Sequence, residues 1–267
     1  MIKRPTRIIC LLLLLCLAVL AAGQTPKPPP AGATGVIRLK VRVSVGDGSK
    51  AEGLARKRFF LIKGSLDQNK DLIQAIEQHP VVSRDCYYRS IGASEELIAW
   101  LKANRCESVY CREVEEKDTA AVPEFQHAVA VGEKEYGSQE LARKWLTVNL
   151  SENIRGGFYK LQQQDLHGLL ARAERESHAK VLSVMTDRNG TAYFTEVEPG
   201  VYVISNMIPA EVGSSTELWR CPVTVAAGDL ATEKPYLISD PGNKDPRDKR
   251  IKCTSVTKPL PTCPRIP

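Results

Sequence analysis

Apolar and polar residues alternate strictly along residues 36–45, close to the start of the chain. One face of this segment is entirely apolar, and the other carries the cations Arg38, Lys40 and Arg42. A period of two predicts a β-strand with one buried face. Outward charges are typical of a protected edge strand, so we expect this strand at the edge of a sheet. A second strand is predicted over residues 58–63.

Between residues 66 and 178 the apolar positions follow a helical period. Several helix boundaries are marked by residues with a known role there: Ser94 and Ser138 are suited to cap a helix, Pro123 to its first turn, and Gly137 to its end. The apolar positions expected to face a core are Leu72, Ile73, Ile76, Leu97, Ile98, Trp100, Leu101, Phe125, Val129, Tyr136, Leu141, Trp145, Leu146, Leu166, Leu169, Leu170 and Ala173. A hundred residues of this character predict an inserted helical subdomain rather than a loop.

Strand periodicity returns after residue 179, and residues 186–206 combine two turns with two alternating runs. The segment 187–190, Asp-Arg-Asn-Gly, favours a tight reversal. After it, Phe194 stands on an apolar face that Tyr202 resumes. Pro199-Gly200 lies between the two runs and predicts a type II turn with Gly200 at positive φ. The pattern therefore predicts an antiparallel hairpin.

The same stretch resembles a known family. Its residues match the T-D-x-x-G-x-x-x-F … P-G-x-Y signature of carboxypeptidase-regulatory-like domains at Thr186, Asp187, Gly190, Phe194, Pro199, Gly200 and Tyr202. The runs 36–45 and 58–63 resemble the first strands of that family, and 219–228 and 235–239 resemble its closing strands. The resemblance implies an antiparallel transthyretin-like β-sandwich of the carbohydrate-binding-like type, and the family's domains accompany peptidases without being catalytic.

Together these patterns predict an α+β fold in which a helical insertion interrupts a sandwich. The expected divisions are a signal peptide (1–23), a proline-rich linker (24–35), the first part of the sandwich (36–65), the helical insertion (66–178), the second part of the sandwich (179–239) and a disordered tail rich in Pro, Lys and Arg (240–267).

Residues 1–23 have the composition of a secretory signal peptide, with Lys3, Arg4 and Arg7 ahead of a short apolar run that ends in small residues. The run is shorter than the roughly twenty residues a permanent membrane span requires. We therefore expect a secreted or periplasmic protein without a stable membrane span. Removal of the signal peptide lowers the formal net charge from +6 to +3. So small a positive charge disfavours nucleic-acid binding by the cluster Arg56-Lys57-Arg58.

Six of the eight cysteines remain after the signal peptide: Cys86, Cys106, Cys111, Cys221, Cys253 and Cys263. An even number in an oxidising compartment predicts disulfides, with fifteen possible pairings, although any single cysteine can instead be a buried free thiol. Three of the six lie in the insertion. At least one bridge is therefore expected inside it, and Cys221 is a candidate partner for the third.

The search for catalytic chemistry gives few candidates. None of the four histidines has a carboxylate at helical metal-ligand spacing, and the sequence has no nucleophile elbow, phosphate loop or dinucleotide fingerprint. We accordingly predict no metal, no cofactor and no catalytic residue. Paired carboxylates that meet only in space stay open as glycoside-cleaving groups.

Two functions are compatible with these patterns. The first is a non-catalytic extracytoplasmic binding or structural module that presents the helical insert to a protein or glycan of the cell envelope, where Tyr87 and Tyr88 stack on sugars if they are exposed. The alternative is a cell-envelope hydrolase with a site between insert and sandwich. A cleft there with carboxylates or histidines of perturbed pKa distinguishes the second from the first.

Overall fold

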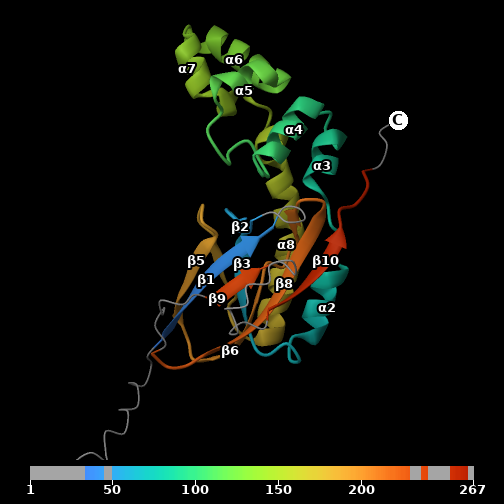
Figure 1. Cartoon of the computed structure of the whole chain (residues 1–267), viewed down its shortest axis with the longest axis vertical. Coiled ribbons are helices and arrows are strands. Elements are labelled where there is room, and N and C mark those ends of the chain that lie inside the picture. The colour runs from blue at the N-terminus through green and yellow to red at the C-terminus, as the bar shows by residue number, and fades with distance from the viewer. Residues whose placement is uncertain (1–33, 45–49, 229–235, 240–252, 264–267) are drawn as a thin grey trace, which may run out of the picture.

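The computed structural model describes residues 34–44, 50–228, 236–239 and 253–263. The predicted signal peptide (1–23) and nearly all of the linker (24–35) lie outside these residues. Most of the tail, residues 240–252 and 264–267, lies outside them as well. Figure 1 shows a body of strands with helices along one side and above it.

The fold is α+β, as the sequence predicted. The strands are β1 (Gly35–Val43), β2 (Glu52–Gly53), β3 (Arg58–Lys63), β4 (Leu182–Met185), β5 (Thr191–Val197), β6 (Gly200–Ser205), β7 (Ala210–Val212), β8 (Ser215–Val225), β9 (Tyr236–Ser239) and β10 (Thr254–Pro259). Within the described residues, the helices lie between β3 and β4. They are α2 (Lys70–Gln78), α3 (Arg84–Ser90), α4 (Glu95–Ala103), α5 (Glu116–Ala121), α6 (Pro123–Tyr136), α7 (Gln139–Lys144) and α8 (Phe158–Ser177), with short 3-10 and π turns at Leu146–Asn149 and Asn153–Gly157.

The strands form two sheets. In the first, β1 pairs with β2, β5 and β9, and in the second the order is β10-β8-β6-β3-β4, with β7 beside β8. Among the described strands, β1 and β9 pair in parallel and the other pairings are antiparallel. The edge position expected for β1 is therefore wrong. Leu39 and Lys40 pair with β5 and also with β9, so both sides of the strand are hydrogen-bonded there.

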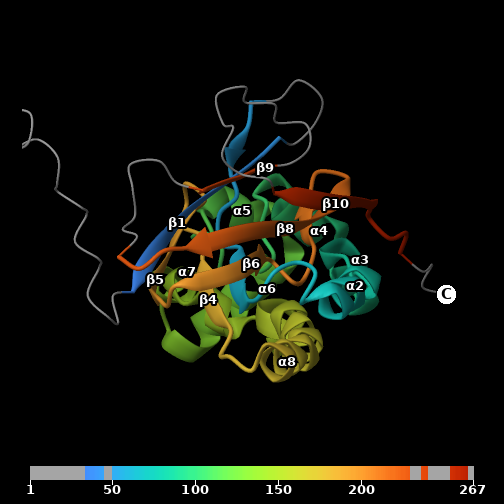
Figure 2. The same ribbon diagram turned by 90° about the horizontal axis from the view of Figure 1, so that it is seen from below.

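The two sheets pack against each other through one apolar core. β1 alternates buried and half-buried residues along its whole length, and its apolar face meets residues of the second sheet. The largest fully buried members are Trp219, Phe59 and Phe194, and the rings of Phe59 and Trp219 lie 5.8 Å apart. Figure 2 shows the two groups of strands in this arrangement.

The hairpin predicted over 186–206 is wrong. β5 pairs with β1 in the first sheet, whereas β6 pairs with β3 and β8 in the second. The connection between them therefore crosses from one sheet to the other. Phe194 and Tyr202 still face the same core, but from opposite sides. Alternation reports which face of a strand is buried and not which partner it pairs with.

The predicted helix boundaries are confirmed in the insertion. The Ser94 and Ser138 hydroxyls accept hydrogen bonds from the N–H groups of Leu97 and Leu141, which caps α4 and α7. Pro123 is the first residue of α6, and Gly137 ends that helix in the left-handed conformation. These local signals act within one turn, which is why the sequence identifies them well.

Two separate cores hold the helices. α2 and α8 pack on the outer face of the second sheet, through Leu72, Ile73, Ile76, Leu166, Leu169 and Ala173 against Phe60, Ile62, Val203 and Leu218. A different core, centred on Tyr88, Phe125 and Phe158, joins α3 to α7 and the start of α8. Figure 1 shows α5, α6 and α7 far from the sheets. The expected insertion thus consists of a layer on the sheet and a part beyond it.

The disorder predicted for the tail does not extend to residues 253–263. β10 pairs with β8 over six residues, from Thr254 opposite Arg220 to Pro259 opposite Ser215. A disulfide on each side of β10 fixes it, Cys221–Cys253 before and Cys86–Cys263 after. Composition predicted disorder because few apolar residues are present, and covalent links replace that burial here. No helix in the described ranges is long and apolar enough to span a membrane.

Candidate functional site

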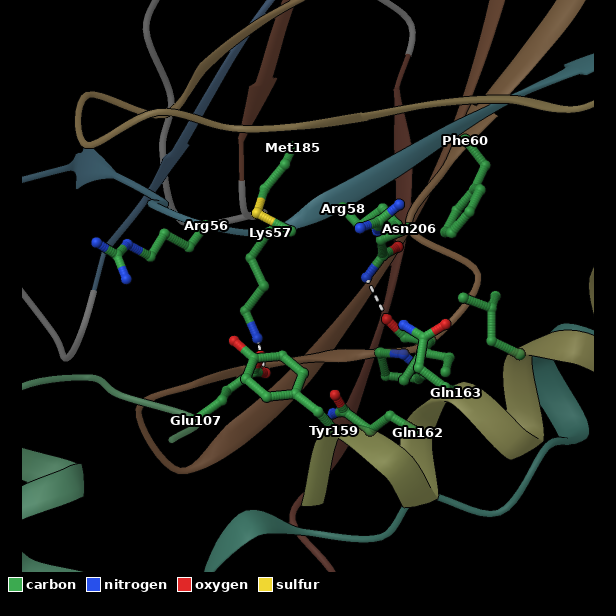
Figure 3. A pocket seen from close by; sticks show the side chains of 13 residues that line it. Arg56, Lys57, Arg58, Phe60, Glu107, Tyr159, Gln162, Gln163, Met185 and Asn206 are labelled. Atoms are coloured by element: carbon green, nitrogen blue, oxygen red, sulfur yellow. Dashed lines mark hydrogen bonds and ion pairs between the residues drawn. The ribbon is translucent and has the colours of Figure 1, made fainter. Parts of the chain in front are cut away.

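A cleft lies where the second sheet meets helix α8. Its volume is about 290 Å³. It is lined by three cations (Arg56, Lys57, Arg58), one carboxylate (Glu107), the polar side chains of Tyr159, Gln162, Gln163 and Asn206, and the apolar residues Phe60, Leu166, Met185, Ile208 and Pro209 (Figure 3). The position corresponds to the junction between sandwich and insert that the sequence analysis named.

Each wall follows from local structure. Residues 56–58 lead into β3, whose next residues are buried in the sheet. On α8, Tyr159, Gln162, Gln163 and Leu166 are spaced by three, four and seven residues, so they share one helical face. Glu107 lies in the segment after α4, in the part of the insertion whose core is centred on Tyr88, Phe125 and Phe158. The cleft therefore joins the sheet, the helix packed on it and the part of the insertion beyond.

Lys57 and Glu107 form an ion pair across this junction. Their side chains are only 15% and 16% exposed, so water screens the pair little. Burial lowers the pKa of Lys57 to about 8, while the nearby Glu211 carboxylate acts in the opposite direction. Figure 3 shows the Lys57 side chain extending toward Glu107 and the ring of Tyr159.

Arg56 and Arg58 have a different environment. Both are exposed, and each makes one hydrogen bond to a neutral oxygen: Arg56 to the Tyr110 carbonyl at 2.8 Å and Arg58 to the Ser183 hydroxyl at 3.3 Å. Neither belongs to an ion pair within the described part of the chain. Two guanidinium groups are therefore available to an anionic ligand.

Asn206 and Tyr159 are two further polar residues of the cleft, and they play different parts. Asn206 is buried and saturated: its amide donates to the Ile208 and Glu217 carbonyls, and its oxygen accepts from the Trp219 N–H. Burial raises the pKa of Tyr159, so this phenol stays protonated at neutral pH. The side chain of Asn206 is therefore fully hydrogen-bonded within the fold. Tyr159 instead contributes a protonated hydroxyl to the lining of the cleft.

The first three signature residues act on the connection beside the cleft. The Thr186 hydroxyl accepts from the Lys57 N–H and donates to the Leu54 carbonyl, which fixes the backbone that carries residues 56–58. Asp187 accepts from two N–H groups of its own turn. At Gly190, φ is +75°, and a Cβ would lie 2.2 Å from the Val41 carbonyl oxygen. The turn predicted over 187–190 is confirmed by the bond from the Gly190 N–H to the Asp187 carbonyl.

The remaining signature residues belong to the sheets. Phe194 and Tyr202 are buried in the shared core, and the Tyr202 hydroxyl donates to the Glu198 carbonyl just before Pro199. The type II turn expected at Gly200 is wrong, since its φ is +159° and it pairs with Val225 as the first residue of β6. Such a φ lies far from the roughly +80° of that turn. Gly200 is instead extended at the start of β6, where the chain enters the second sheet after crossing from β5.

All six candidate cysteines are bonded, as Cys86–Cys263, Cys106–Cys111 and Cys221–Cys253. One bridge lies inside the insertion, as expected. The suggested pairing of Cys221 with a cysteine of the insertion is wrong. It bonds to Cys253 because β10 lies beside β8, and Cys86 of the insertion pairs with the tail instead.

Histidines do not gather in the cleft. His79, which follows the last residue of α2, has its Nε2 atom 3.5 Å from the Oδ2 atom of Asp165 on α8, and neither residue lines the cleft. The described residues contain no group of three or more His, Cys, Asp or Glu side chains that fits a metal ion. The groups that line the cleft therefore suit binding of an anion by cations and hydrogen-bond donors.

The exposure considered for Tyr88 and the burial predicted for Leu141 and Trp145 are wrong. Tyr88 is fully buried, with its hydroxyl bonded to the Glu107 and Ile154 carbonyls, and Tyr87 packs edge-on against it at 5.3 Å. Tyr88 therefore offers no free face to a sugar, and the half-buried Tyr87 ring also packs against Phe158 at 5.6 Å. Conversely, Leu141 and Trp145, predicted to be buried, are 44% and 51% exposed, beside Val148 at 48%. Periodicity placed them on one face, but none of the helices and strands in the described ranges covers that face.

Sequence reasoning missed most of the cleft. It singled out residues 56–58 only as a possible nucleic-acid contact, and it gave Glu107, Tyr159 and Gln162 no role. One signal was present: Tyr159, Gln162 and Gln163 continue the face of Leu166 toward the start of α8, where polar residues replace the apolar ones. Polar side chains on the buried face of a helix indicate a cavity or a polar neighbour.

The fold and the cleft define an α+β protein with a cationic site at the junction of its sheet and helices. No family model and no curated protein matches the chain. Among solved structures, one match is the RrgB pilus backbone of Streptococcus pneumoniae, with 10% sequence identity and a TM-score of 0.25, covering 78% of this chain and 40% of that one. Another is the full-length RrgB pilus protein of the same organism, with 11% identity and a TM-score of 0.24, covering 87% of this chain and 31% of that one. The chain spans less than half of either, and TM-scores this low carry no argument about fold or function.

Proposed function

We propose that this chain is an exported, non-catalytic binding module, whose cleft between sheet and helical insertion holds an acidic group of a protein or glycan partner in the cell envelope. Its body is proposed to be a transthyretin-like sandwich of the carboxypeptidase-regulatory-like kind, in line with the signature at 186–202. The observation that carries the proposal is the pair Arg56 and Arg58, which line a cavity without a carboxylate partner in the described chain.

The charge of the cleft favours an anion. Three cations face one carboxylate, and Glu107 is already engaged by Lys57. A guanidinium binds carboxylate, sulfate or phosphate through paired, charge-assisted hydrogen bonds. The amides of Gln162 and Gln163 add donors on the opposite wall, and Met185 and Phe60 supply apolar contact for the rest of the bound group.

The non-catalytic assignment rests on what the lining residues lack. A hydrolase needs a second acid or base, a nucleophile or a metal near the bond to be cleaved. Here the single carboxylate, Glu107, forms an ion pair with Lys57. Among the described residues that line the cavity, none is a histidine, cysteine or serine. One feature favours the alternative of an envelope hydrolase: Lys57, with its pKa lowered to about 8, is a group of the kind enzymes use as a base.

Export is supported by the cysteines. Three disulfides in a chain of 267 residues require an oxidising compartment to form and persist. The N-terminal composition of a signal peptide points the same way. A secreted or periplasmic location is therefore part of the proposal.

The test is capture of partners from an envelope extract by the mature protein and two variants. Arg56→Gln/Arg58→Gln removes both charges and leaves a shorter, neutral side chain with two N–H donors in place of five at each position. Arg172→Gln is the matched control, since Arg172 lies on α8, pairs with Glu176 and does not line the cleft. We expect the double variant to capture about tenfold less of the specific partner and the control to capture the wild-type amount.

Equal capture by all three proteins contradicts the cleft as the binding site. The captured glycan or protein is then incubated with wild type and with Lys57→Met. We expect no turnover in either case. Turnover by wild type that Lys57→Met abolishes establishes the hydrolase instead.

A further inference from the structure

A second positively charged hollow lies on the outer face of the first sheet, away from the cleft. It is a shallow depression of about 410 Å³, formed by β1, β5, Gly53 and the turn between β4 and β5. Its lining includes the four cations Arg38, Lys40, Arg42 and Arg188, the ring of Tyr193 and one carboxylate, Asp187. The proposed function makes no use of this surface.

The three cations of β1 form a straight row. They alternate with the buried residues of the core face, so all three point outward from one strand. Successive members of such a row are about 6.8 Å apart, twice the rise per residue of a strand. Like charges this close repel one another and destabilise a sheet unless something compensates them.

The described chain supplies little compensation. None of Arg38, Lys40, Arg42 and Arg188 takes part in an ion pair among these residues. The carboxylate of Asp187 accepts the N–H groups of Asn189 and Thr191 at 2.8 Å each. Both bonds go to Oδ1, which holds this carboxylate in its turn. Arg42 donates to the Ala51 carbonyl and, after Arg105, helps to lower the pKa of Glu52. Arg38, Lys40 and Arg188 are therefore the cations most available to a ligand.

Arg38 and Tyr193 add a recognition element at one end of the row. They pair across β1 and β5, and the guanidinium lies 5.9 Å from the centre of the ring. The ring is 48% exposed. The Nε atom of Arg38 is buried, and no hydrogen-bond partner for it exists in the described residues. An exposed aromatic face beside a cation suits a ring-shaped group that carries a negative charge.

We propose that this face of the first sheet binds an acidic polysaccharide, with its carboxylate or sulfate groups along Arg38, Lys40 and Arg42 and one sugar ring on Tyr193. A linear row of cations matches a chain with anionic groups at regular intervals better than a single small anion. A membrane surface is a poorer match, because apart from Tyr193 the lining offers no large apolar side chain to insert. A duplex is also disfavoured, since strong nucleic-acid binders neutralise about six to ten phosphates.

Binding of polygalacturonate, heparin and neutral dextran to the mature protein tests this, by affinity electrophoresis at low and high salt. We expect both acidic polymers to retard the wild type and dextran to leave it unchanged. Arg38→Gln/Lys40→Gln/Arg42→Gln is expected to weaken binding about a hundredfold and to lower the slope of log affinity against log salt by about 2. Tyr193→Ala is expected to weaken it about fivefold with the same slope.

Arg172→Gln is the matched control and should bind the polymers as wild type does, since Arg172 pairs with Glu176 on α8 and lines neither this hollow nor the cleft. Loss of polymer binding in Arg56→Gln/Arg58→Gln, with full binding by the outer-face variants, assigns the polymers to the cleft and overturns this proposal. If the triple variant fails to fold, the single variants Arg38→Gln and Lys40→Gln replace it, each with a smaller loss. Equal retardation of wild type and the outer-face variants overturns the proposal. Retardation by dextran overturns the role of charge, and binding to phosphatidylglycerol vesicles without binding to either acidic polymer assigns the face to membranes.

Discussion

Lys57 is a cation held in a place that penalises its charge. Burial lowers its pKa to about 8, from 10.5 for an exposed lysine. Between these values the unfolded chain binds the proton and the folded protein releases it, so folding stability must rise as the pH rises through this window. Below about pH 8 both states are protonated, and the contribution of Lys57 no longer changes.

The prediction compares wild type with Lys57→Met, which keeps the length and apolar stem of the side chain. From pH 8 to 10.5 the unfolding free energy of wild type should increase relative to the variant by about 2–3 kcal/mol, following about 1.4 kcal/mol per unit of pKa. Urea unfolding at several pH values measures the difference. A difference that does not change with pH means that Lys57 titrates normally and that Glu107 fully offsets its burial.

Gly190 should be the most demanding glycine of the signature. Its φ of +75° disfavours any side chain, and an added Cβ would lie 2.2 Å from the Val41 carbonyl oxygen and 2.9 Å from the Leu54 nitrogen. Gly190→Ala is expected to cost about 3 kcal/mol, from backbone strain and overpacking together. Thermal melting of the purified variant measures this.

Gly92→Ala is the control for that variant, because Gly92 has a similar φ of +74° between α3 and α4 and a Cβ added there would meet nothing within 4 Å. Strain alone should cost about 1 kcal/mol there. Equal melting temperatures for the two variants would show that the close approach at Gly190 relaxes without cost.

Strand β10 depends on its disulfides more than on burial. Most of its residues are exposed or half-buried, and its side chains add little to the core. Cys86–Cys263 closes a separation of 177 residues, whereas Cys106–Cys111 closes one of 5. In the chain-entropy account, a longer loop closed by a bridge gives a larger stabilisation.

We therefore predict that Cys86→Ser/Cys263→Ser lowers stability by about 2–4 kcal/mol and speeds amide exchange in β10. Cys106→Ser/Cys111→Ser should cost less and leave exchange in β10 unchanged. Hydrogen exchange read by mass spectrometry distinguishes the two. Unchanged exchange in β10 in the first variant would mean that Cys221–Cys253 and the pairing with β8 are sufficient.

The helical insertion is not a single removable unit. Leu72 of α2 and Leu169 of α8 cover Phe60 and Val203 on the outer face of the second sheet. Removing all of 66–177 would expose that face, and the sheet would lose the burial of a whole core cluster. The part from α3 to the π turn at 153–157 has its own core, and its ends meet near Tyr87 and Phe158, whose rings are 5.6 Å apart.

The prediction concerns two deletions, each bridged by a short Gly/Ser linker. Deletion of 84–157, with Phe158→Ser and Cys263→Ser to remove the unpaired groups, should leave a β-rich domain that melts cooperatively. Deletion of 66–177 should aggregate or lose its cooperative transition. Circular dichroism with thermal melting separates the outcomes. If the larger deletion melts cooperatively and the smaller does not, the division of cores drawn here is wrong.

The sequence by itself determined the elements. Alternation located β1, the cap Ser94 and the first-turn residue Pro123 located helices, and Asp187 with Gly190 located a turn, because all of these depend on contacts within a few residues. Cysteine number and compartment indicated disulfides, though not their pairing.

Only the tertiary structure decided how these elements meet. It placed β5 and β6 in different sheets, enclosed β1 between partners, left Trp145 exposed and joined Cys86 to Cys263. It also brought Glu107 of the insertion to Lys57 of the sheet, fifty residues away in the chain, to form the cleft. Periodicity reports that a face is buried and not what buries it, so a site assembled from distant residues has no local pattern from which to predict it.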